Sequence, residues 1–238
     1  MANKKKSKKY KVKVTENGPY LVTGGLSLSE EIIETDEDGI SVGWKKGKKF
    51  GVKEEYALCR CGHSGNQPYC NRAHAEKNFD GSETASKKGF KEQAEFINGK
   101  GVALYDAEAL CAVARFCDLG KGAWQLAEDS GDPEDKKLCI KESELCPSGR
   151  LVAVDKKTGK VYEPEFDPSI VLIQDPARKV SGPLYLKGGI PVISADGFEY
   201  EVRNRQTLCR CGESKNKPFC DGTHISCGFR DDIPENKG

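Results

Sequence analysis

The sequence has little that would direct it to nucleic acid, to a membrane or to export. The 38 basic and 37 acidic side chains leave a net charge of +1, which provides no strong field for polyanions or anionic lipid. No apolar run approaches the length of a membrane span. The start, MANKKKSKKYKVKV, is rich in lysine but lacks the apolar stretch of a secretory signal and the arginines of a transit peptide. We interpret it as a solvated tail, with an anionic docking patch as the alternative.

Motifs for nucleotide binding and for acid–base catalysis are also missing. No glycine pair belongs to a G-x-x-x-x-G-K phosphate loop. The 238 residues include only three histidines, and no nucleophile can be paired with a base. We therefore expect a protein that is not an enzyme. The hydrophobic fraction of 37% allows modest cores but is low for one large core, and Trp44 and Trp124 are expected to serve packing.

Cysteine, in contrast, is abundant and recurs at fixed spacing. Six of the eleven cysteines and all three histidines fall in two related segments, and two of the histidines occupy equivalent positions. The first is CRCGHSGNQPYCNRAH, from Cys59 to His74, and the second is CRCGESKNKPFCDGTH, from Cys209 to His224. Tight spacing without an export signal favours free thiolates in a reducing cytoplasm over a disulfide framework. Thiolates and an imidazole at repeated spacing predict a bound metal centre in each copy.

The pattern C-x-C-x8-C-x3-H suits a two-iron cluster better than zinc, which remains the alternative. Structural zinc sites typically use C-x2-4-C pairs, and the pair here is tighter. In a two-iron cluster, the first two thiolates would bind one iron, and the third cysteine and the histidine would bind the other. His63 corresponds to Glu213 in the second copy, so we expect it to be exposed and not a ligand. Arg60 and Arg210, between the paired cysteines, either offset cluster charge or face solvent.

The motif C-x-C-x2-S-x3-P-x-C-x3-H closely resembles the CDGSH iron–sulfur proteins, the family related to mitoNEET. The second copy, from Cys220 to His224, nearly spells the signature, whereas the first departs at Arg72 and Ala73. The resemblance implies a [2Fe-2S] cluster in each copy. The implied ligands are Cys59, Cys61, Cys70 and His74 in the first copy, and Cys209, Cys211, Cys220 and His224 in the second.

The resemblance also has implications for assembly and chemistry. Single-motif members resemble homodimers with a shared β-cap, so two copies in one chain imply an intrachain pseudo-dimer and a monomeric protein. One neutral imidazole ligand removes a negative charge from the cluster and can accept a proton, so we expect a redox-active, acid-labile site. We expect His224→Cys to be more stable in acid and to have a lower potential.

The repeat extends upstream of both motifs. Gly-Pro and Gly-Gly pairs precede each copy, and only the first copy carries an insertion, EEIIETDEDGISVGW. Alternating residues predict strands at 10–14, 20–22 and 198–202. Asn71 and Asp221 are expected to cap short helical turns that place the third cysteine and the histidine on one face. We divide the chain into a first unit (1–90), a middle segment (91–178) and a second unit (179–238).

The middle segment is expected to be partly helical. Asp106 is predicted to cap a helix through AEALCAVARFC, Asp132 a helix through EDKKLCIKESEL, and SIVLIQD is predicted to be a strand. Cys111-x5-Cys117, followed by Cys146-Pro147-Ser148-Gly149, resembles single-cluster ferredoxin segments, with Cys139 as a conceivable fourth ligand. However, AVARF lacks the glycine usual in such loops, and a helix would put Cys111 and Cys117 on different faces.

The middle cysteines therefore have three interpretations. They are buried apolar side chains, a degenerate or real third cluster at Cys111, Cys117 and Cys146, or a disulfide. Cys227 is expected to be a packed thiol.

We predict an α+β protein with two small β-rich CDGSH-type units and a partly helical middle segment. It would be cytoplasmic, bind two [2Fe-2S] clusters, bind no nucleic acid, and transfer electrons or clusters to redox or cluster-acceptor proteins. The alternatives are a zinc-binding interaction module and an oxidoreductase subunit with a third cluster.

Overall fold

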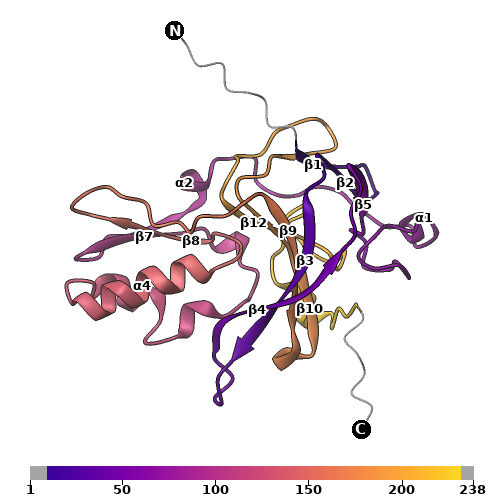
Figure 1. Cartoon of the computed structure of the whole chain (residues 1–238). Coiled ribbons are helices and arrows are strands. Elements are labelled where there is room, and N and C mark those ends of the chain that lie inside the picture. Colours follow the sequence, from indigo (N-terminus) through magenta and orange to yellow (C-terminus); the bar gives the residue numbers. More distant parts are fainter. Residues whose placement is uncertain (1–9, 232–238) are drawn as a thin grey trace.

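The computed structural model describes residues 10–231, so the lysine-rich start before Tyr10 lies outside this range. The described chain is a mixed α/β structure, dominated by strands in three sheets, with few and short helices (Figure 1). Strand dominance agrees with the expected β-rich units. None of the helices in this range is long and apolar enough to cross a membrane.

The first sheet has four strands in the order β11-β1-β2-β5. The predicted alternation in β1 is confirmed, because Val12 and Val14 are buried while Lys11 and Lys13 are exposed. The strand predicted at 198–202 is wrong: this stretch forms only an isolated bridge from Glu199, because its partner β11 is two residues long. The bounds are β1 Lys11–Val14, β2 Tyr20–Thr23, β5 Glu55–Leu58 and β11 Val192–Ile193.

The second sheet has five strands in the order β12-β10-β9-β3-β4. The predicted strand SIVLIQD is confirmed as β9, which pairs with β10 antiparallel and with β3 parallel. The sequence insertion of the first copy lies in the hairpin of β3 and β4, which extends this sheet. The bounds are β3 Ser27–Thr35, β4 Ser41–Phe50, β9 Ser169–Asp175, β10 Val180–Lys187 and β12 Arg205–Leu208.

The main apolar core is built from both of these sheets. Val12 and Val22 of the first sheet and Leu172 and Leu186 of the second belong to one cluster of buried side chains. Burial of this apolar surface is the main favourable contribution to folding, and it holds the two units of the repeat together.

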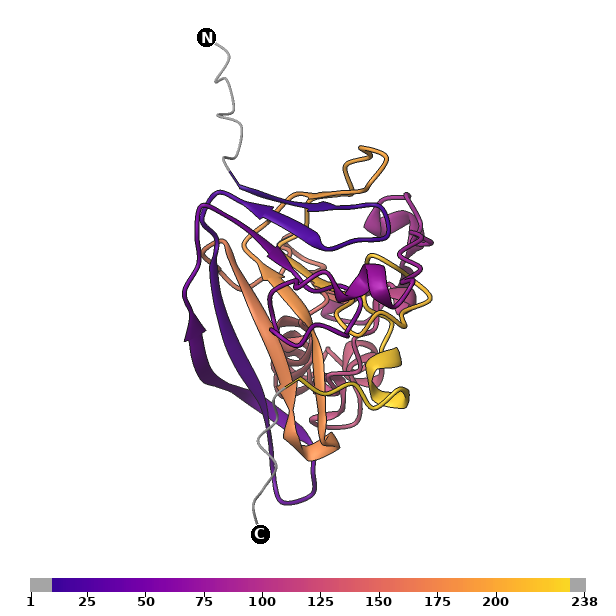
Figure 2. The same ribbon diagram turned by 90° about the vertical axis from the view of Figure 1, so that its right-hand side faces the viewer.

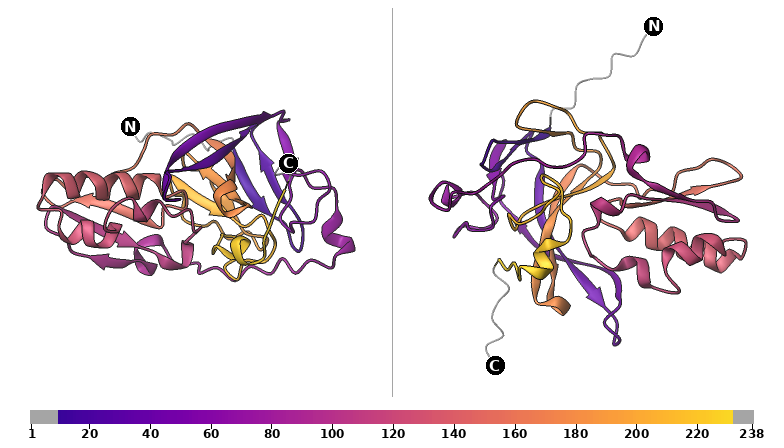
Figure 3. Two further views of the ribbon diagram at one scale, coloured as in Figure 1. Left: turned by 90° about the horizontal axis from the view of Figure 1, so that it is seen from below. Right: turned by 180° about the vertical axis from the view of Figure 1, so that it is seen from behind.

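A third sheet, β6-β7-β8, packs with α3 and α4 to the side of the other two (Figures 1 and 3). Its own core includes Val102, Leu126, Cys139 and Leu151. The predicted cap of α4 is confirmed, because the Asp132 carboxylate accepts from two backbone N–H groups of the first turn. The bounds are β6 Glu95–Ile97, β7 Val102–Asp106, β8 Leu151–Asp155, α3 Ala123–Glu128 and α4 Pro133–Leu145.

The helix predicted through AEALCAVARFC is wrong. The segment has two 3-10 turns, Glu108–Leu110 and Phe116–Asp118, and a loop between them. Val113 (φ 53°) and Arg115 (φ 63°) adopt the left-handed conformation, at a cost of about 1–2 kcal/mol each. Arg115 is held there by two hydrogen bonds to the buried Asp175 carboxylate, at 2.6 and 3.1 Å. Such a long-range ion pair overrides the local helical preference.

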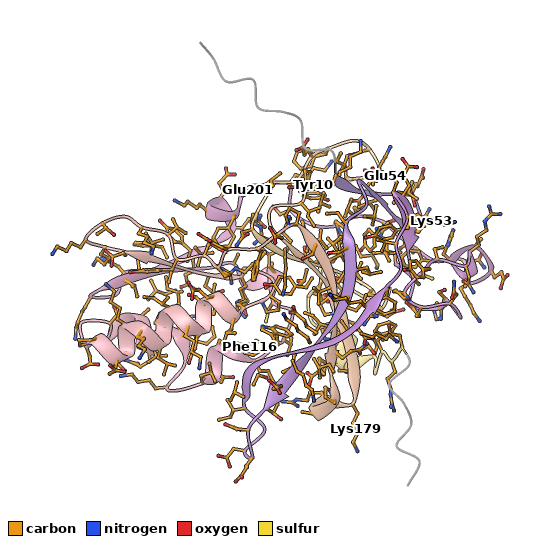
Figure 4. The ribbon with its side chains drawn as sticks, in the orientation of Figure 1. Tyr10, Lys53, Glu54, Phe116, Lys179 and Glu201 are labelled. Atoms are coloured by element: carbon orange, nitrogen blue, oxygen red, sulfur yellow. The ribbon has the colours of Figure 1, made fainter. Side chains whose placement is uncertain are left out.

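The loop is also anchored by packing. Phe116 packs against Trp44 with ring centroids 4.7 Å apart, which places it where the middle segment meets β4 (Figure 4). Both tryptophans pack as expected, and Trp124 donates to Asp106, which therefore caps no helix. The remaining elements are α1 Ala73–Glu76, α2 Phe90–Gln93, α5 Thr223–Ser226 and a 3-10 turn at Pro176–Arg178.

Candidate metal centres

The two repeated motifs fold into closely similar loops after β5 and β12. In each loop the first cysteine donates its N–H to the carbonyl of the shared proline, Pro68 or Pro218, at 2.8 Å. The shared serine closes the loop: Ser64 Oγ donates to Tyr69 O at 2.6 Å and Ser214 Oγ to Phe219 O at 2.7 Å. The residues common to the two copies are thus those that fold the loop.

Each loop brings its four predicted ligands together as two pairs. The Sγ atoms of Cys59 and Cys61 are 3.7 Å apart, as are those of Cys209 and Cys211. Cys70 Sγ lies 3.5 Å from His74 Nδ1, and Cys220 Sγ lies 3.4 Å from His224 Nδ1. The expected placement of the third cysteine and the histidine on one face is confirmed.

The two-plus-two arrangement distinguishes between the candidate metals. Within residues 10–231, no three histidine, cysteine or acidic side chains converge closely enough to hold one metal ion. Structural zinc requires four donors around one ion. Two separate pairs instead fit two irons, each with two protein ligands. The donor set therefore fits a binuclear cluster.

The helical turns that carry the histidines begin one residue later than predicted. Asn71 and Asp221 do accept from the backbone N–H two residues ahead, at 3.1 and 3.0 Å, but the residues that precede the helices are Arg72 and Gly222, both left-handed. Their N–H groups each donate to the third cysteine's Sγ at 3.4 Å. Asn71 and Asp221 thus hold the start of each helical turn, and the residue that follows each of them directs its N–H group toward a ligand sulfur.

Hydrogen bonding prepares one thiolate in each C-x-C pair. The neighbouring thiol of Cys61 lowers the pKa of Cys59, and backbone N–H groups of Ser64 and Gly62 add to this effect. Cys211 has the same effect on the pKa of Cys209. The thiolate is the metal-binding form of cysteine, so these donors favour binding.

Arg60 and Arg210 do not face solvent, since each is only 1% exposed. Arg60 donates to Thr15 O at 3.1 Å and lies over the ring of Tyr20. Arg210 forms an ion pair with the buried Asp231 and donates to Gly182 O at 3.0 Å. Both guanidinium groups therefore tie a ligand loop to the strands behind it.

The two loops differ in exposure. Cys220 and His224 are 3% and 4% exposed, whereas Cys70 and His74 are only half-buried and lie beside exposed Asn71. Burial, together with the nearby positive charge of Arg210, lowers the pKa of His224 to about 4. Figure 2 shows α1 and α5, the two histidine-bearing turns, on the same side of the five-stranded sheet.

The middle segment packs against the second loop and not against the exposed part of the first. Asn216 Nδ2 donates to Ala109 O at 2.7 Å, and Val113 lies directly over Gly222. A Cβ atom on Gly222 would be 2.3 Å from Val113 Cγ2, so only glycine fits there. Arg72, in the same left-handed conformation, is exposed. The first motif can therefore carry arginine at the position of Gly222, because this position is exposed to solvent.

The two ligand loops also contact each other reciprocally. A Cβ on Gly62 (φ +79°) would be 2.4 Å from Cys211 O, and one on Gly212 (φ +88°) would be 2.6 Å from Cys61 O. Tyr20 of the first unit has its hydroxyl 2.8 Å from Cys209 O. The sequence analysis did not predict the contact between the two loops. The glycine that follows each C-x-C pair, Gly62 and Gly212, could have indicated it.

Three of the four middle cysteines share one pocket. Cys111, Cys117 and Cys146 line it together with Ala114 and Arg150. The disulfide alternative is wrong, because every cysteine is unpaired. We expected a helix to place Cys111 and Cys117 on different faces, and this expectation is wrong because the helix is absent. Burial, together with the nearby negative charge of Asp118, raises the pKa of Cys117 to about 12.

Two other thiols lie elsewhere. Cys139 belongs to the core of the third sheet, where its Sγ is 3.6 Å from Ala123 O, so it is separate from this pocket. The expectation of a packed Cys227 is wrong: this thiol is exposed, because it follows the last residue of α5 at the surface. His63 is exposed as expected.

Comparison with protein-family models gives two matches. The family described as iron-binding zinc finger, CDGSH type, matches residues 17–75 and 181–225, and the family described as divergent 4Fe-4S mono-cluster matches residues 97–156. Comparison with curated proteins and with solved structures gives no match. The chain is therefore an iron–sulfur protein. It consists of two CDGSH domains, which bind [2Fe-2S] clusters, flanking a divergent 4Fe-4S mono-cluster domain that indicates an additional cluster.

Proposed function

We propose that this chain is an electron-transfer protein and has no organic substrate of its own. Its two CDGSH domains would form an intrachain pseudo-dimer. The [2Fe-2S] ligands would be the eight residues predicted from the motif: Cys59, Cys61, Cys70 and His74, and Cys209, Cys211, Cys220 and His224. When bound, the clusters supply one-electron chemistry.

The observation that carries this proposal is the direct succession of the three sites. The loops of the first and second sites touch through Gly62 and Gly212. The second site touches the middle site through Gly222, whose Cβ would lie 2.3 Å from Val113 and 3.5 Å from Cys111 O. Direct packing contacts therefore connect all three ligand loops.

Two arginines clamp the middle site to the second CDGSH domain. Arg205, fully buried in β12, donates to Cys146 O at 2.7 Å and to Leu151 O at 3.2 Å. Arg203 donates to Ser148 O at 3.0 Å. Because β12 leads into Cys209, the same strand positions ligand loops of two sites. This construction fixes the spacing of neighbouring sites, as electron transfer requires.

A test compares electron transfer with cluster transfer. The anaerobic protein, reduced with dithionite and freed of excess reductant, is mixed with cytochrome c, while the oxidised protein is mixed separately with an apo-ferredoxin. We expect cytochrome c to be reduced while iron and sulfide remain on the chain. Iron and sulfide passing to the apo-ferredoxin, with slow cytochrome c reduction, would contradict the proposal.

Cluster delivery is the second candidate, favoured by the exposure of the first site. Only there do a cysteine and a histidine of the predicted set, Cys70 and His74, reach solvent. If delivery occurs, it would empty the first site and leave the second, whose predicted ligands are all buried, intact. A Cys59→Ser variant would then lose delivery, and a Cys209→Ser variant would retain it.

A further inference from the structure

We propose that the middle site has three protein ligands, Cys111, Cys117 and Cys146, and that it holds a three-iron [3Fe-4S] cluster. This inference rests on the proposed function only in assuming that the chain carries iron–sulfur clusters. It disagrees with the family description, which names a four-iron cluster.

The disagreement begins in the sequence. A four-iron cluster is held by four cysteines, and the bacterial ferredoxin run supplies three of them as C-x2-C-x2-C, with a C-P pair as another source. This chain has Cys111-x2-Ala114-x2-Cys117, followed by Cys146-Pro147. Alanine thus occupies the position of the middle cysteine. The structure places Ala114 in the same pocket as the three thiols. Ala114 therefore replaces the middle cysteine in space as well as in the sequence pattern.

No other side chain that lines the pocket replaces the missing thiolate. Cys139 lies in the core of the third sheet and lines no part of this pocket. Asp118 is exposed. Ser148 is buried in the pocket, but its Oγ is 3.5 Å from Cys146 Sγ and accepts from Arg150 N at 3.2 Å, so it is committed to the turn that carries Cys146. Arginine has no lone pair to offer a metal.

The surroundings of Ala114 also exclude a ligand from solvent. Ala114 is 8% exposed and belongs to an apolar cluster with Phe116, Ile173 and Tyr185. Water or hydroxide at this corner would have to be held among apolar side chains without polar partners. A fourth iron would therefore lack any donor at the Ala114 corner, whereas the other three corners each have a thiolate. The geometry points to a cluster that lacks this iron.

The other groups at the pocket suit an anionic cluster. Arg150 carries its guanidinium close to Cys111, and its two hydrogen bonds to Asp106, at 2.5 and 2.7 Å, hold it in place. A fixed cation beside thiolate ligands offsets their charge.

The experiment uses the full chain, purified anaerobically and incubated with excess Fe²⁺ and sulfide. A three-iron cluster is paramagnetic when oxidised, whereas oxidised two-iron and four-iron clusters are not. We expect an EPR signal from the oxidised protein and about seven irons per chain by chemical analysis, which Mössbauer spectra of the ⁵⁷Fe protein should divide as about four in the two binuclear sites and three in the middle site. Ala114→Cys should remove the oxidised signal, add about one iron and give a four-iron signal on reduction.

Matched variants make the assignment specific. Ala114→Val, which adds apolar bulk but no thiol, should keep the three-iron signal, and so should Cys139→Ala. Cys111→Ala should abolish it while the two-iron signals of the reduced CDGSH sites remain. An EPR-silent oxidised wild type would overturn the proposal, whether the site proves empty or four-iron. That result leaves the two-iron signals unchanged, so it is distinct from failure of the proposed function. If Ala114→Cys fails to fold, the wild-type spectra still decide.

Discussion

Replacing Gly222 by alanine should disrupt the contact that covers the second metal site. The new Cβ would be 2.3 Å from Val113 Cγ2, and the residue would keep φ +85°. The left-handed conformation costs a non-glycine residue about 1–2 kcal/mol. Overpacking a tight contact costs about 1–3 kcal/mol more. We therefore expect Gly222→Ala to lower the free energy of unfolding by about 2–5 kcal/mol.

The first motif provides the control, because Arg72 has the same left-handed conformation (φ 72°) and is exposed. Arg72→Ala should change the free energy of unfolding by less than about 0.5 kcal/mol. Adding Val113→Ala to Gly222→Ala should recover the overpacking part, about 1–3 kcal/mol. Urea unfolding followed by tryptophan fluorescence measures this directly, since Trp44 packs on Phe116 beside the contact. Equal effects of Gly222→Ala and Arg72→Ala, or no recovery in the double variant, would refute the reasoning.

Three further predictions concern the loop anchor, pH and access to the sites. Asp231→Asn leaves the buried Arg210 without its counter-charge and should cost about 3–5 kcal/mol in urea unfolding; a loss below 1 kcal/mol would contradict this role. Burial raises the pKa of Glu142 from 4.5 to about 7, so the folded state holds a proton that the unfolded chain releases; stability should fall as pH rises from about 4.5 to 7, and Glu142→Gln should flatten this slope, which an unchanged slope would disprove. An iron chelator should remove the first CDGSH cluster well before the second, giving biphasic loss of visible absorption; Cys59→Ser should abolish the fast phase, and its persistence would show that exposure does not set the order.

The repeated loops could be predicted because their determinants are local. The cysteine spacing, the shared proline and the shared serine all act within sixteen residues, and the structure shows them in the same roles twice. The strands β1, β2 and β9 were likewise predictable from alternation or from an uninterrupted apolar run. Helix α4 was predictable from its Asp-Pro start.

Features set by distant residues could not be predicted. The left-handed conformation of Arg115 depends on Asp175, sixty positions away, and without that ion pair AVARF has the composition of a helix. The left-handed glycine at position 222 fits against Val113, which no local pattern links to the second motif. Residues 198–202 show the same dependence in a strand. Their alternating pattern predicts a strand, but the partner strand β11 is only two residues long.

The most direct test of the central claim is the visible absorption spectrum of the anaerobically purified chain, with iron, sulfide and zinc counted per chain. We predict a coloured protein with at least about four irons and four sulfides, a count that falls by about two of each in a Cys59→Ser or a Cys209→Ser variant. A colourless protein with two zinc ions would contradict the account, because it would show that the paired donors of each loop close around a single metal ion.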